Sequence, residues 1–225
     1  GDGGIIVTLG SGTMSSNVRS TEQQLLAAIA LKGELFAAGG NGPLLYSSDH
    51  GKHWNKLALP SQQAVYAMAR IDNTTALMVG ERGAILRSDD GAHSWSAIEG
   101  VTPMTLLSVA SNDAGISLAV GQQGSLVRSE DRGLTWHTID LAAAMRNVVA
   151  GGINETLVAV SFANPTTALV ATSNGAMLRS IDTGLTWQAV AGVTTPVTRF
   201  AFADARNGIA IGAAGLVIRT SNGGK

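Results

Sequence analysis

The chain has 225 residues, a formal net charge of −1 and 45% hydrophobic residues, which is enough for one large domain or two small ones. A nearly neutral chain lacks the basic surface that nucleic-acid binding by counterion release requires, and no run of eighteen apolar residues predicts a membrane span. The absence of cysteine excludes disulfides, thiol chemistry and thiolate metal sites. Abundant glycine, with 28 residues, and only 14% charged residues favour a β-rich fold.

The first predicted element lies in the N-terminal segment, residues 1–20, which belongs to no repeat. Its apolar run at 4–9 contains the sequence Ile-Ile-Val-Thr-Leu. Residues with branched β-carbons pack well on a pleated sheet, so we expect a β-strand at this position.

From residue 21 onward, one pattern of four short strands recurs about five times. In the third repeat, apolar runs at 106–110 and 116–120 flank a polar turn, and a Gly-x-x-Gly turn at 121–124 precedes the next strand. Four strands in about forty residues form one propeller blade. We therefore predict an all-β propeller of about five four-stranded blades in a single domain over residues 1–225. The blades are expected at 21–60, 61–100, 101–140, 153–192 and 193–225.

Each of the first four repeats contains an octet that ends in tryptophan, and the tryptophans lie 41, 41 and 51 residues apart. The Asp of each octet can accept hydrogen bonds from amides of its own turn, and the following Gly can adopt a positive φ. The Trp ring can then pack over the hairpin. The residues expected to hold these turns are Asp49 and Trp54, Asp90 and Trp95, Asp131 and Trp136, and Asp182 and Trp187. A fifth octet starts at Thr220 and reaches Lys225 without a Trp.

The connection after the third octet is about ten residues longer than its counterparts, and the extra residues fall at 140–152. Asp140 is a good helix N-cap and is followed by a run of alanines, so we expect one to two turns of helix. The insertion is either an extended loop between blades or a partner-binding element added to a regular scaffold.

The octet matches the Asp box, or bacterial neuraminidase repeat, S-x-D-x-G-x-T-W, completely in the third and fourth copies. Over roughly residues 25–225 the repeats resemble the photosystem II stability and assembly factor family, including the stretch Val-Gly-Glu-Arg-Gly-Ala-Ile-Leu-Arg-Ser-Asp-Asp-Gly at 79–91. The resemblance implies a non-catalytic scaffold without a cofactor, which binds a protein partner during assembly or stabilisation of a membrane or envelope complex. It also implies a periplasmic or secreted location.

Closure of the ring is a separate question, because exposed edges of the first and last blades invite aggregation. The fifth repeat lacks the Thr-Trp strand, and we expect the strand at 4–9 to supply the missing fourth strand. The alternative is that the chain is a fragment of a larger propeller with further blades.

Arginine recurs immediately before the octet, so four arginines are expected at equal radius. They either pair locally within their blades or form a positive arc that binds carboxylates of an acidic partner. Arginines that break the repeat are better candidates for specific recognition, because structural roles would recur; they are Arg82, Arg132, Arg146, Arg199 and Arg206. The candidate partner-binding residues are Arg87, Arg128, Arg179, Arg219, Arg82 and Arg146.

The alternative function is a sialidase-like glycoside hydrolase or a carbohydrate-binding propeller. The resemblance to sialidases implies an arginine triad and a Tyr–Glu nucleophile pair, yet no Phe/Tyr-Arg-Ile-Pro motif is present and only Tyr46 and Tyr66 are available. All tryptophans belong to octets, which leaves few aromatic rings for stacking on sugars. The histidines are spread over three blades without metal-ligand spacing. We therefore predict no catalytic residue, metal site or cofactor.

Overall fold

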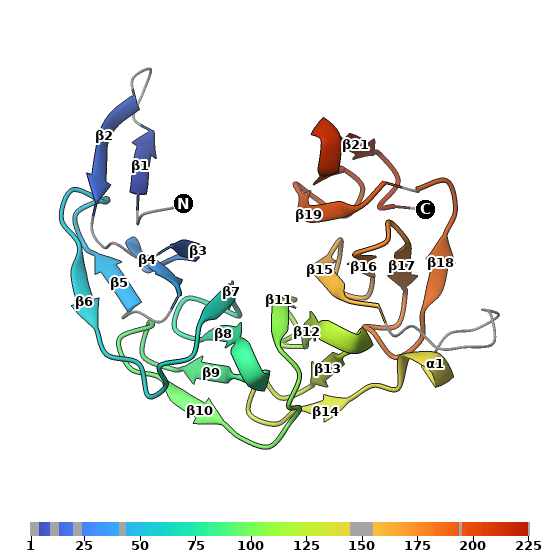
Figure 1. Cartoon of the computed structure of the whole chain (residues 1–225), viewed down its shortest axis with the longest axis horizontal. Helices are drawn as coiled ribbons and strands as arrows, with labels where there is room; N and C mark the ends of the chain where they lie inside the picture. Colours follow the sequence, from blue (N-terminus) through green and yellow to red (C-terminus); the bar gives the residue numbers. More distant parts are fainter. Residues whose placement is uncertain are drawn as a thin grey trace.

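The computed structural model describes residues 5–9, 14–19, 24–40, 44–144, 155–193 and 195–224. Five antiparallel sheets follow one another along the chain, and Figure 1 shows them as blades arranged in an arc around a common centre. The all-β propeller with five blades that the repeats predict is confirmed. Among the described residues, no helix is long and apolar enough to cross a membrane.

Each of the first four blades is a four-stranded meander, and three strands are described in the fifth. Blade 1 contains β3 (Leu25–Leu31), β4 (Glu34–Gly39), β5 (Leu44–Ser47) and β6 (Asn55–Leu57). Blade 2 contains β7 (Val65–Arg70), β8 (Ala76–Gly80), β9 (Ile85–Ser88) and β10 (Ser96–Ile98). Blade 3 contains β11 (Leu106–Ser111), β12 (Ser117–Gly121), β13 (Leu126–Ser129) and β14 (His137–Thr138). Blade 4 contains β15 (Leu157–Phe162), β16 (Ala168–Thr172), β17 (Met177–Ser180) and β18 (Gln188–Val190), and blade 5 contains β19 (Val197–Phe202), β20 (Gly208–Gly212) and β21 (Val217–Thr220).

Three of the Gly-x-x-Gly turns form short 3-10 turns, η2 (Glu81–Gly83), η3 (Gln122–Gly124) and η4 (Ala213–Gly215). The first glycine of each turn is required by a close approach of two chains. A Cβ atom on Gly80 would lie 2.0 Å from the carbonyl oxygen of Ala64, which is far inside van der Waals contact. The end of β8 therefore lies directly against the start of β7, the strand before it in the blade.

The hydrophobic core lies in the seams between blades. Side chains alternate along each central strand, so Met78 packs into the seam with blade 1 while Leu77 and Val79 pack into the seam with blade 3. Because the central strands of blades 2 to 4 are covered on both sides, β8, β12 and β16 are buried along their whole length. Near-continuous apolar sequence in these strands follows from this two-sided burial.

The insertion after blade 3 begins with the short helix α1 (Leu141–Ala144). Asp140 caps it, because its Oδ1 accepts hydrogen bonds from the amides of Ala142 at 3.0 Å and Ala143 at 3.2 Å. The predicted helical turn with an Asp140 cap is therefore confirmed. The rest of the insertion, including Arg146, lies outside the described residues.

The N-terminal strand pairs differently from the expectation. β1 (Ile5–Leu9) pairs with β2 (Met14–Arg19) in a separate antiparallel hairpin, and β20 is the one described strand that pairs with β21. Figure 1 shows this hairpin and blade 5 on opposite sides of the opening in the arc. A hairpin closes only a short loop, whereas joining β1 to β21 closes most of the chain at a greater entropy cost. In this structure β1 is not paired with blade 5. Its role as the fourth strand of that blade stays a prediction.

Candidate functional site

The Asp box is a turn whose polar groups are satisfied within the octet. In the fourth box, Asp182 Oδ1 accepts a hydrogen bond from the Thr186 amide at 2.9 Å, and Oδ2 accepts one from the Thr186 hydroxyl at 2.6 Å. Ser180 Oγ donates to Asp182 Oδ1 at 2.8 Å and accepts the Gly184 amide at 2.8 Å. The indole Nε1 of Trp187 donates to the Gly184 carbonyl at 3.0 Å. The same pattern recurs in the boxes of Asp90 and Asp131.

These hydrogen bonds fix the charge of the box carboxylates. Burial raises the pKa of Asp90, but hydrogen bonds from the Ser94 hydroxyl and amide outweigh it and bring the pKa to about 2. The pKa values of Asp131 and Asp182 are lowered by the same balance, and that of Asp49 is lowered mainly by the His53 amide. Carboxylates that are ionised and saturated with donors are poorly suited to proton transfer. The boxes are structural, not acid–base groups.

The box also docks onto the blade before it. In the third box, Arg132 and Gly133 have left-handed φ values of 63° and 80°. A Cβ atom on Gly133 would lie 2.6 Å from Leu77 Cδ2, so glycine allows the turn to rest on the preceding blade. Gly184 rests in the same way on Leu118, at 2.7 Å.

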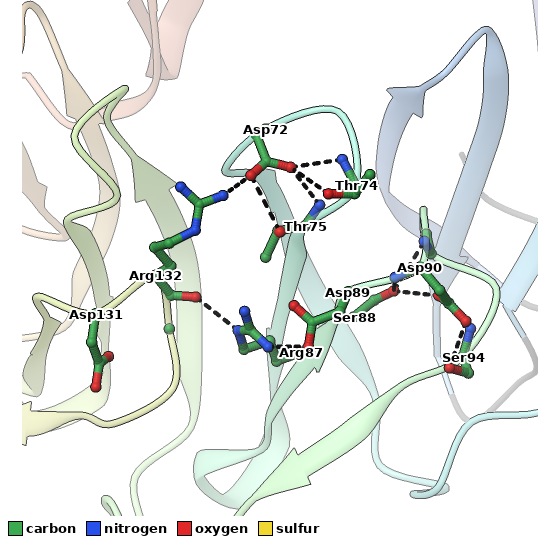
Figure 2. A network of polar contacts seen from close by, with 12 residues as sticks. Asp72, Thr74, Thr75, Arg87, Ser88, Asp89, Asp90, Ser94, Asp131 and Arg132 are labelled. Atoms are coloured by element: carbon green, nitrogen blue, oxygen red, sulfur yellow. Dashed lines mark hydrogen bonds and ion pairs between the residues drawn. The ribbon is translucent and has the colours of Figure 1, made fainter.

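The arginine that precedes the box links two blades. The guanidinium Nε of Arg87 in blade 2 donates to the carbonyl oxygen of Arg132 in the third box at 2.8 Å, and Nη1 pairs with Asp89 (Figure 2). Arg128 repeats this contact with the Thr183 carbonyl and hydroxyl, both at 2.8 Å, and pairs with Glu130. Both arginines are buried. We call this contact the arginine latch.

The contact made from the latch position differs from blade to blade. Tyr46 occupies its position in blade 1 and lies 5.6 Å from the ring of His93 in the second box, measured between ring centroids. Arg179 in blade 4 has a buried Nε with no hydrogen-bond partner among the described residues, and Arg219 in blade 5 is exposed. The four recurrent arginines therefore do not form a uniform positive arc.

The structure separates the six candidate partner-binding arginines. The burial of Arg87 and Arg128 agrees with a structural role, although their carbonyl partners belong to the next blade and not to their own. Arg82 is exposed on η2, 4.0 Å from the carboxylate of Glu81. Arg219 is exposed on the last blade, and Arg146 lies outside the described residues. Partner binding by any of them stays a prediction.

The innermost strands of all five blades line a central cavity of about 340 Å³. Each of these strands carries a β-bulge at its second residue, seen as a register shift between its first and third residues. The third residue therefore occupies an equivalent place in every blade. At this place the five blades carry Ala27, Ala67, Ser108, Ala159 and Arg199. Four blades thus have a small side chain where the fifth has an arginine.

Arg199 gives the cavity a localised positive charge. Its Nη1 donates to the carbonyl oxygen of Thr198 at 2.7 Å, and no ion pair of Arg199 with a described carboxylate is present. Among the described residues that line the cavity, none is Asp or Glu. The sequence already marked Arg199 as breaking the repeat. Its place in the channel needed the register of the bulged strands.

Two histidines of the boxes, His53 and His93, lie close to carboxylates. His53 Nδ1 lies 2.5 Å from Asp49 Oδ2 within one box, and His93 Nε2 lies 3.4 Å from Glu34 Oε2 in the neighbouring blade. Within the described ranges, no group of three His, Cys, Asp or Glu side chains is arranged to hold a metal ion.

Five meander blades with Asp-box turns, whose tryptophans Trp95, Trp136 and Trp187 are buried in the hydrophobic clusters between blades, define an Asp-box β-propeller. The family described as photosynthesis system II assembly factor YCF48 matches residues 52–195, which is more than half of the chain. The chain therefore belongs to the YCF48 family. No curated protein matches the sequence.

Solved propellers share this fold at low sequence identity. The chain is similar to the GH74 xyloglucanase from Xanthomonas campestris, with 16% identity and a TM-score of 0.69 over 91% of this chain and 37% of that one. It is also similar to the Niastella koreensis GH74 enzyme, with 17% identity and a TM-score of 0.67 over 87% and 35%. A structure of YCF48 bound to D1 peptide aligns over 88% and 93% at 16% identity, with a TM-score of only 0.46. The chain thus spans about a third of the length of these GH74 enzymes.

Proposed function

We propose that the chain is a non-catalytic propeller that binds a protein partner, in the assembly or stabilisation of a membrane or envelope complex outside the cytoplasm, either periplasmic or secreted. Membership of the YCF48 family supports a role in assembly. Commitment of the box carboxylates to the hydrogen bonds of their turns supports the absence of catalysis by these groups.

The observation that carries the proposal is the position of Arg199. Its side chain enters a cavity whose equivalent positions hold alanine or serine, so the other blades leave room beside the guanidinium. A guanidinium presents several donors in a planar fork that matches a carboxylate or a pair of carbonyl oxygens. The channel is therefore suited to an acidic side chain or to the C-terminal carboxylate of a polypeptide.

The geometry does not favour glycoside hydrolysis. Most glycoside hydrolases use two carboxyl groups that face one cavity, about 5–9.5 Å apart, and the sialidase type pairs a tyrosine nucleophile with a glutamate. The described lining of the central cavity contains no carboxylate. Likeness to the GH74 enzymes, at 16% and 17% identity, extends to the fold alone.

An affinity pull-down from detergent extracts of the native host tests the proposal. Wild-type protein is compared with Arg199→Glu and with Arg206→Glu, a matched charge reversal at an exposed arginine in the same blade but outside the channel. We expect wild type and Arg206→Glu to retain the same membrane or envelope protein, and Arg199→Glu to lose it. Retention of nothing by the wild type, or equal retention by all three proteins, would contradict the proposal, as would hydrolysis of a glycan substrate.

A further inference from the structure

A second cavity, of about 300 Å³, lies beside the first turns of blades 3, 4 and 5. The first turn of a blade joins its innermost strand to the next strand, and these three turns comprise residues 112–116, 163–167 and 203–207. We call this cavity the turn groove. It shares no lining residue with the central cavity, which is lined by the middle of the same innermost strands. Its volume is that of a small-molecule site.

The turn groove carries a negative charge. Asp113 and Asp204 line it, and its described lining contains no Lys, Arg or His. Asp113 is exposed, and its carboxylate forms no ion pair or hydrogen bond with the described residues. The central cavity has the opposite charge, because Arg199 lines it without a described carboxylate. A ligand of the turn groove is therefore expected to be a cation.

The carboxylate of Asp204 is oriented by its own turn. Its Oδ1 accepts hydrogen bonds from the amides of Arg206 and Asn207, both at 2.8 Å, and its Oδ2 accepts one from Asn207 Nδ2 at 2.9 Å. These bonds, led by those from the Asn207 side chain, lower the pKa of Asp204. No ion pair joins Asp204 to Arg206. Since each carboxylate oxygen has two lone pairs, Oδ2 can still accept a bond from a ligand.

Two phenylalanine rings form the apolar part of the turn groove. Phe162 and Phe202 are the last residues of β15 and β19, so they occupy equivalent positions in blades 4 and 5, and both line the groove. Each ring is partly buried, Phe162 against the cluster between blades 3 and 4 and Phe202 against the cluster between blades 4 and 5. An aromatic face attracts a cation, and a guanidinium also stacks on it. Carboxylates beside such rings suit a cation on an apolar stem.

The seam between blades 2 and 3 contains such a cation at the corresponding place. Asp72 is the second residue of the first turn of blade 2, as Asp113 is in blade 3. Arg132, from the box of blade 3, forms an ion pair with Asp72 (Figure 2). A Cβ atom on Gly115 would lie 2.8 Å from Arg132 Cγ, so the arginine stem lies against the first turn of its own blade. This propeller thus already pairs one turn carboxylate with a guanidinium.

The seam between blades 3 and 4 brings no such cation from its box. The residue equivalent to Arg132 in the fourth box is Thr183, and both have left-handed φ values. The Thr183 hydroxyl accepts a hydrogen bond from Arg128 Nη2 at 2.8 Å. A threonine side chain is short and uncharged, so it cannot neutralise Asp113. The carboxylate of Asp113 therefore occupies the place of Asp72 without a guanidinium from the described residues.

From these observations we propose that the turn groove binds a guanidinium group on an alkyl stem. The carboxylates of Asp113 and Asp204 balance its charge, and its stem and flat face lie against the rings of Phe162 and Phe202. An arginine side chain of a polypeptide and a small alkylguanidine both carry this group. The turn groove involves neither Arg199 nor the central cavity, so the inference goes beyond the proposed function and does not depend on it.

Butylguanidinium is the probe for this site, and butylurea, which has nearly the same shape without the charge, is its control. Binding of each to the full chain is measured by calorimetry and by saturation-transfer NMR. The wild type is compared with Asp113→Asn and with Glu99→Gln, which neutralises an exposed carboxylate of blade 2 outside the groove. Thermal unfolding verifies that both variants are folded, which we expect because both side chains are exposed.

We expect butylguanidinium to bind the wild type and Glu99→Gln equally, and Asp113→Asn about fivefold more weakly, because a charged partner is lost. Phe162→Leu, which keeps an apolar side chain but removes the aromatic face, should weaken binding by about threefold. Butylurea should not bind measurably. Equal binding of the two probes, equal affinity of wild type and Asp113→Asn, or no binding of butylguanidinium would overturn the proposal.

A peptide with blocked ends, Gly-Ala-Arg-Ala-Gly, identifies the source of the guanidinium. Tighter binding of this peptide than of butylguanidinium would support an arginine side chain of a polypeptide, and tighter binding of butylguanidinium would support a small alkylguanidine. The Arg199→Ala variant should bind both probes like the wild type, so a failure of the channel hypothesis leaves this result unchanged. Loss of binding in Arg199→Ala would overturn the proposal, because it would place the ligand in the central cavity.

Discussion

The seam between blades 3 and 4 and the seam between blades 4 and 5 have the same backbone plan but different contents. The first contains a buried Trp187 and an arginine latch in which Arg128 makes two 2.8 Å hydrogen bonds to Thr183. The second contains a cavity of about 330 Å³ and an Arg179 whose Nε has no hydrogen bond within the described chain. Among the described residues, the two seams therefore differ in how they are filled and in how they are latched.

The comparison shows that the turn and the seam are separable parts of the repeat. The fifth box keeps its local hydrogen bonds, because the Gly224 amide donates to Thr220 Oγ1 at 2.9 Å and that hydroxyl donates to Asn222 Oδ1 at 2.8 Å. The turn therefore forms without an arginine latch from blade 4. In the seam between blades 3 and 4, the tryptophan and the latch arginine both donate to carbonyl groups of the turn, those of Gly184 and Thr183.

The largest effect is expected from Trp187→Ala in the complete seam. Removal of a fully buried indole should lower the free energy of unfolding by about 3–5 kcal/mol, because transfer energy is lost and a cavity remains. Phe202→Ala, which truncates a partly buried ring beside the cavity between blades 4 and 5, should cost distinctly less. Urea unfolding of both variants measures the difference. Equal losses would show that the two seams contribute alike.

A smaller effect is expected from removal of the latch. Arg128→Met leaves the Thr183 carbonyl without its donor, so we expect a loss of about 1–3 kcal/mol in the free energy of unfolding. Arg179→Met should be close to neutral, because its Nε makes no hydrogen bond with the described residues. Chemical denaturation of the two variants provides the comparison. A loss for Arg179→Met as large as that for Arg128→Met would show that the latch also acts in the last seam.

The next effect concerns pH, because boxes one to four contain Asp where the fifth contains Asn222. The pKa of Asp90 is about 2 in the folded protein, below the ordinary value of 3.8, so the unfolded chain binds protons more readily between these values. The contribution of the carboxylate is complete above about pH 4 and is lost as pH falls toward 2.

We therefore expect the urea midpoint of the wild type to fall steeply below pH 4. The Asp90→Asn variant should have a lower urea midpoint at pH 6 and a midpoint that changes less with pH. Asn222→Asp should make the midpoint change more steeply with pH, because it adds a fifth box carboxylate. Unfolding curves at intervals between pH 6 and pH 2.5 test this ordering. Parallel profiles for the three proteins would mean that the box carboxylates do not control the loss of stability at low pH.

The smallest effect is expected in the seam between blades 1 and 2, where Ala92 replaces the box glycine. Its φ of 74° is left-handed, which costs energy for a residue with a Cβ atom. Ala92→Gly relieves this strain but loses a buried methyl group and gains freedom when unfolded, so we expect a net stabilisation of about 0.5 kcal/mol. Thermal unfolding measures it. A destabilised variant would show that packing of the methyl group outweighs the strain.

Repeat spacing was sufficient to predict the blades, the boxes and the helical cap at Asp140, because each depends on contacts among residues close in sequence. The roles of the arginines were less accessible. Arg87 and Arg128 recur as a structural latch, but their acceptors lie 45 and 55 residues away in the next blade. Sequence spacing within one repeat cannot identify an acceptor in another repeat.

The candidate site shows the same division. Arg199 is recognisable in the sequence as an arginine that breaks the repeat, yet its neighbours at equivalent positions, such as Ala67 and Ala159, become apparent only from the bulged register of the innermost strands.

The sequence by itself determined the all-β propeller, its repeat unit and the local chemistry of the Asp box, because hairpins and turns are stabilised by neighbours along the chain. The tertiary structure alone decided which arginines are buried, which strand β1 pairs with, and where the channel cation lies. These features depend on packing between blades, and long-range packing is set by the geometry of whole sheets, not by the residue types within one repeat.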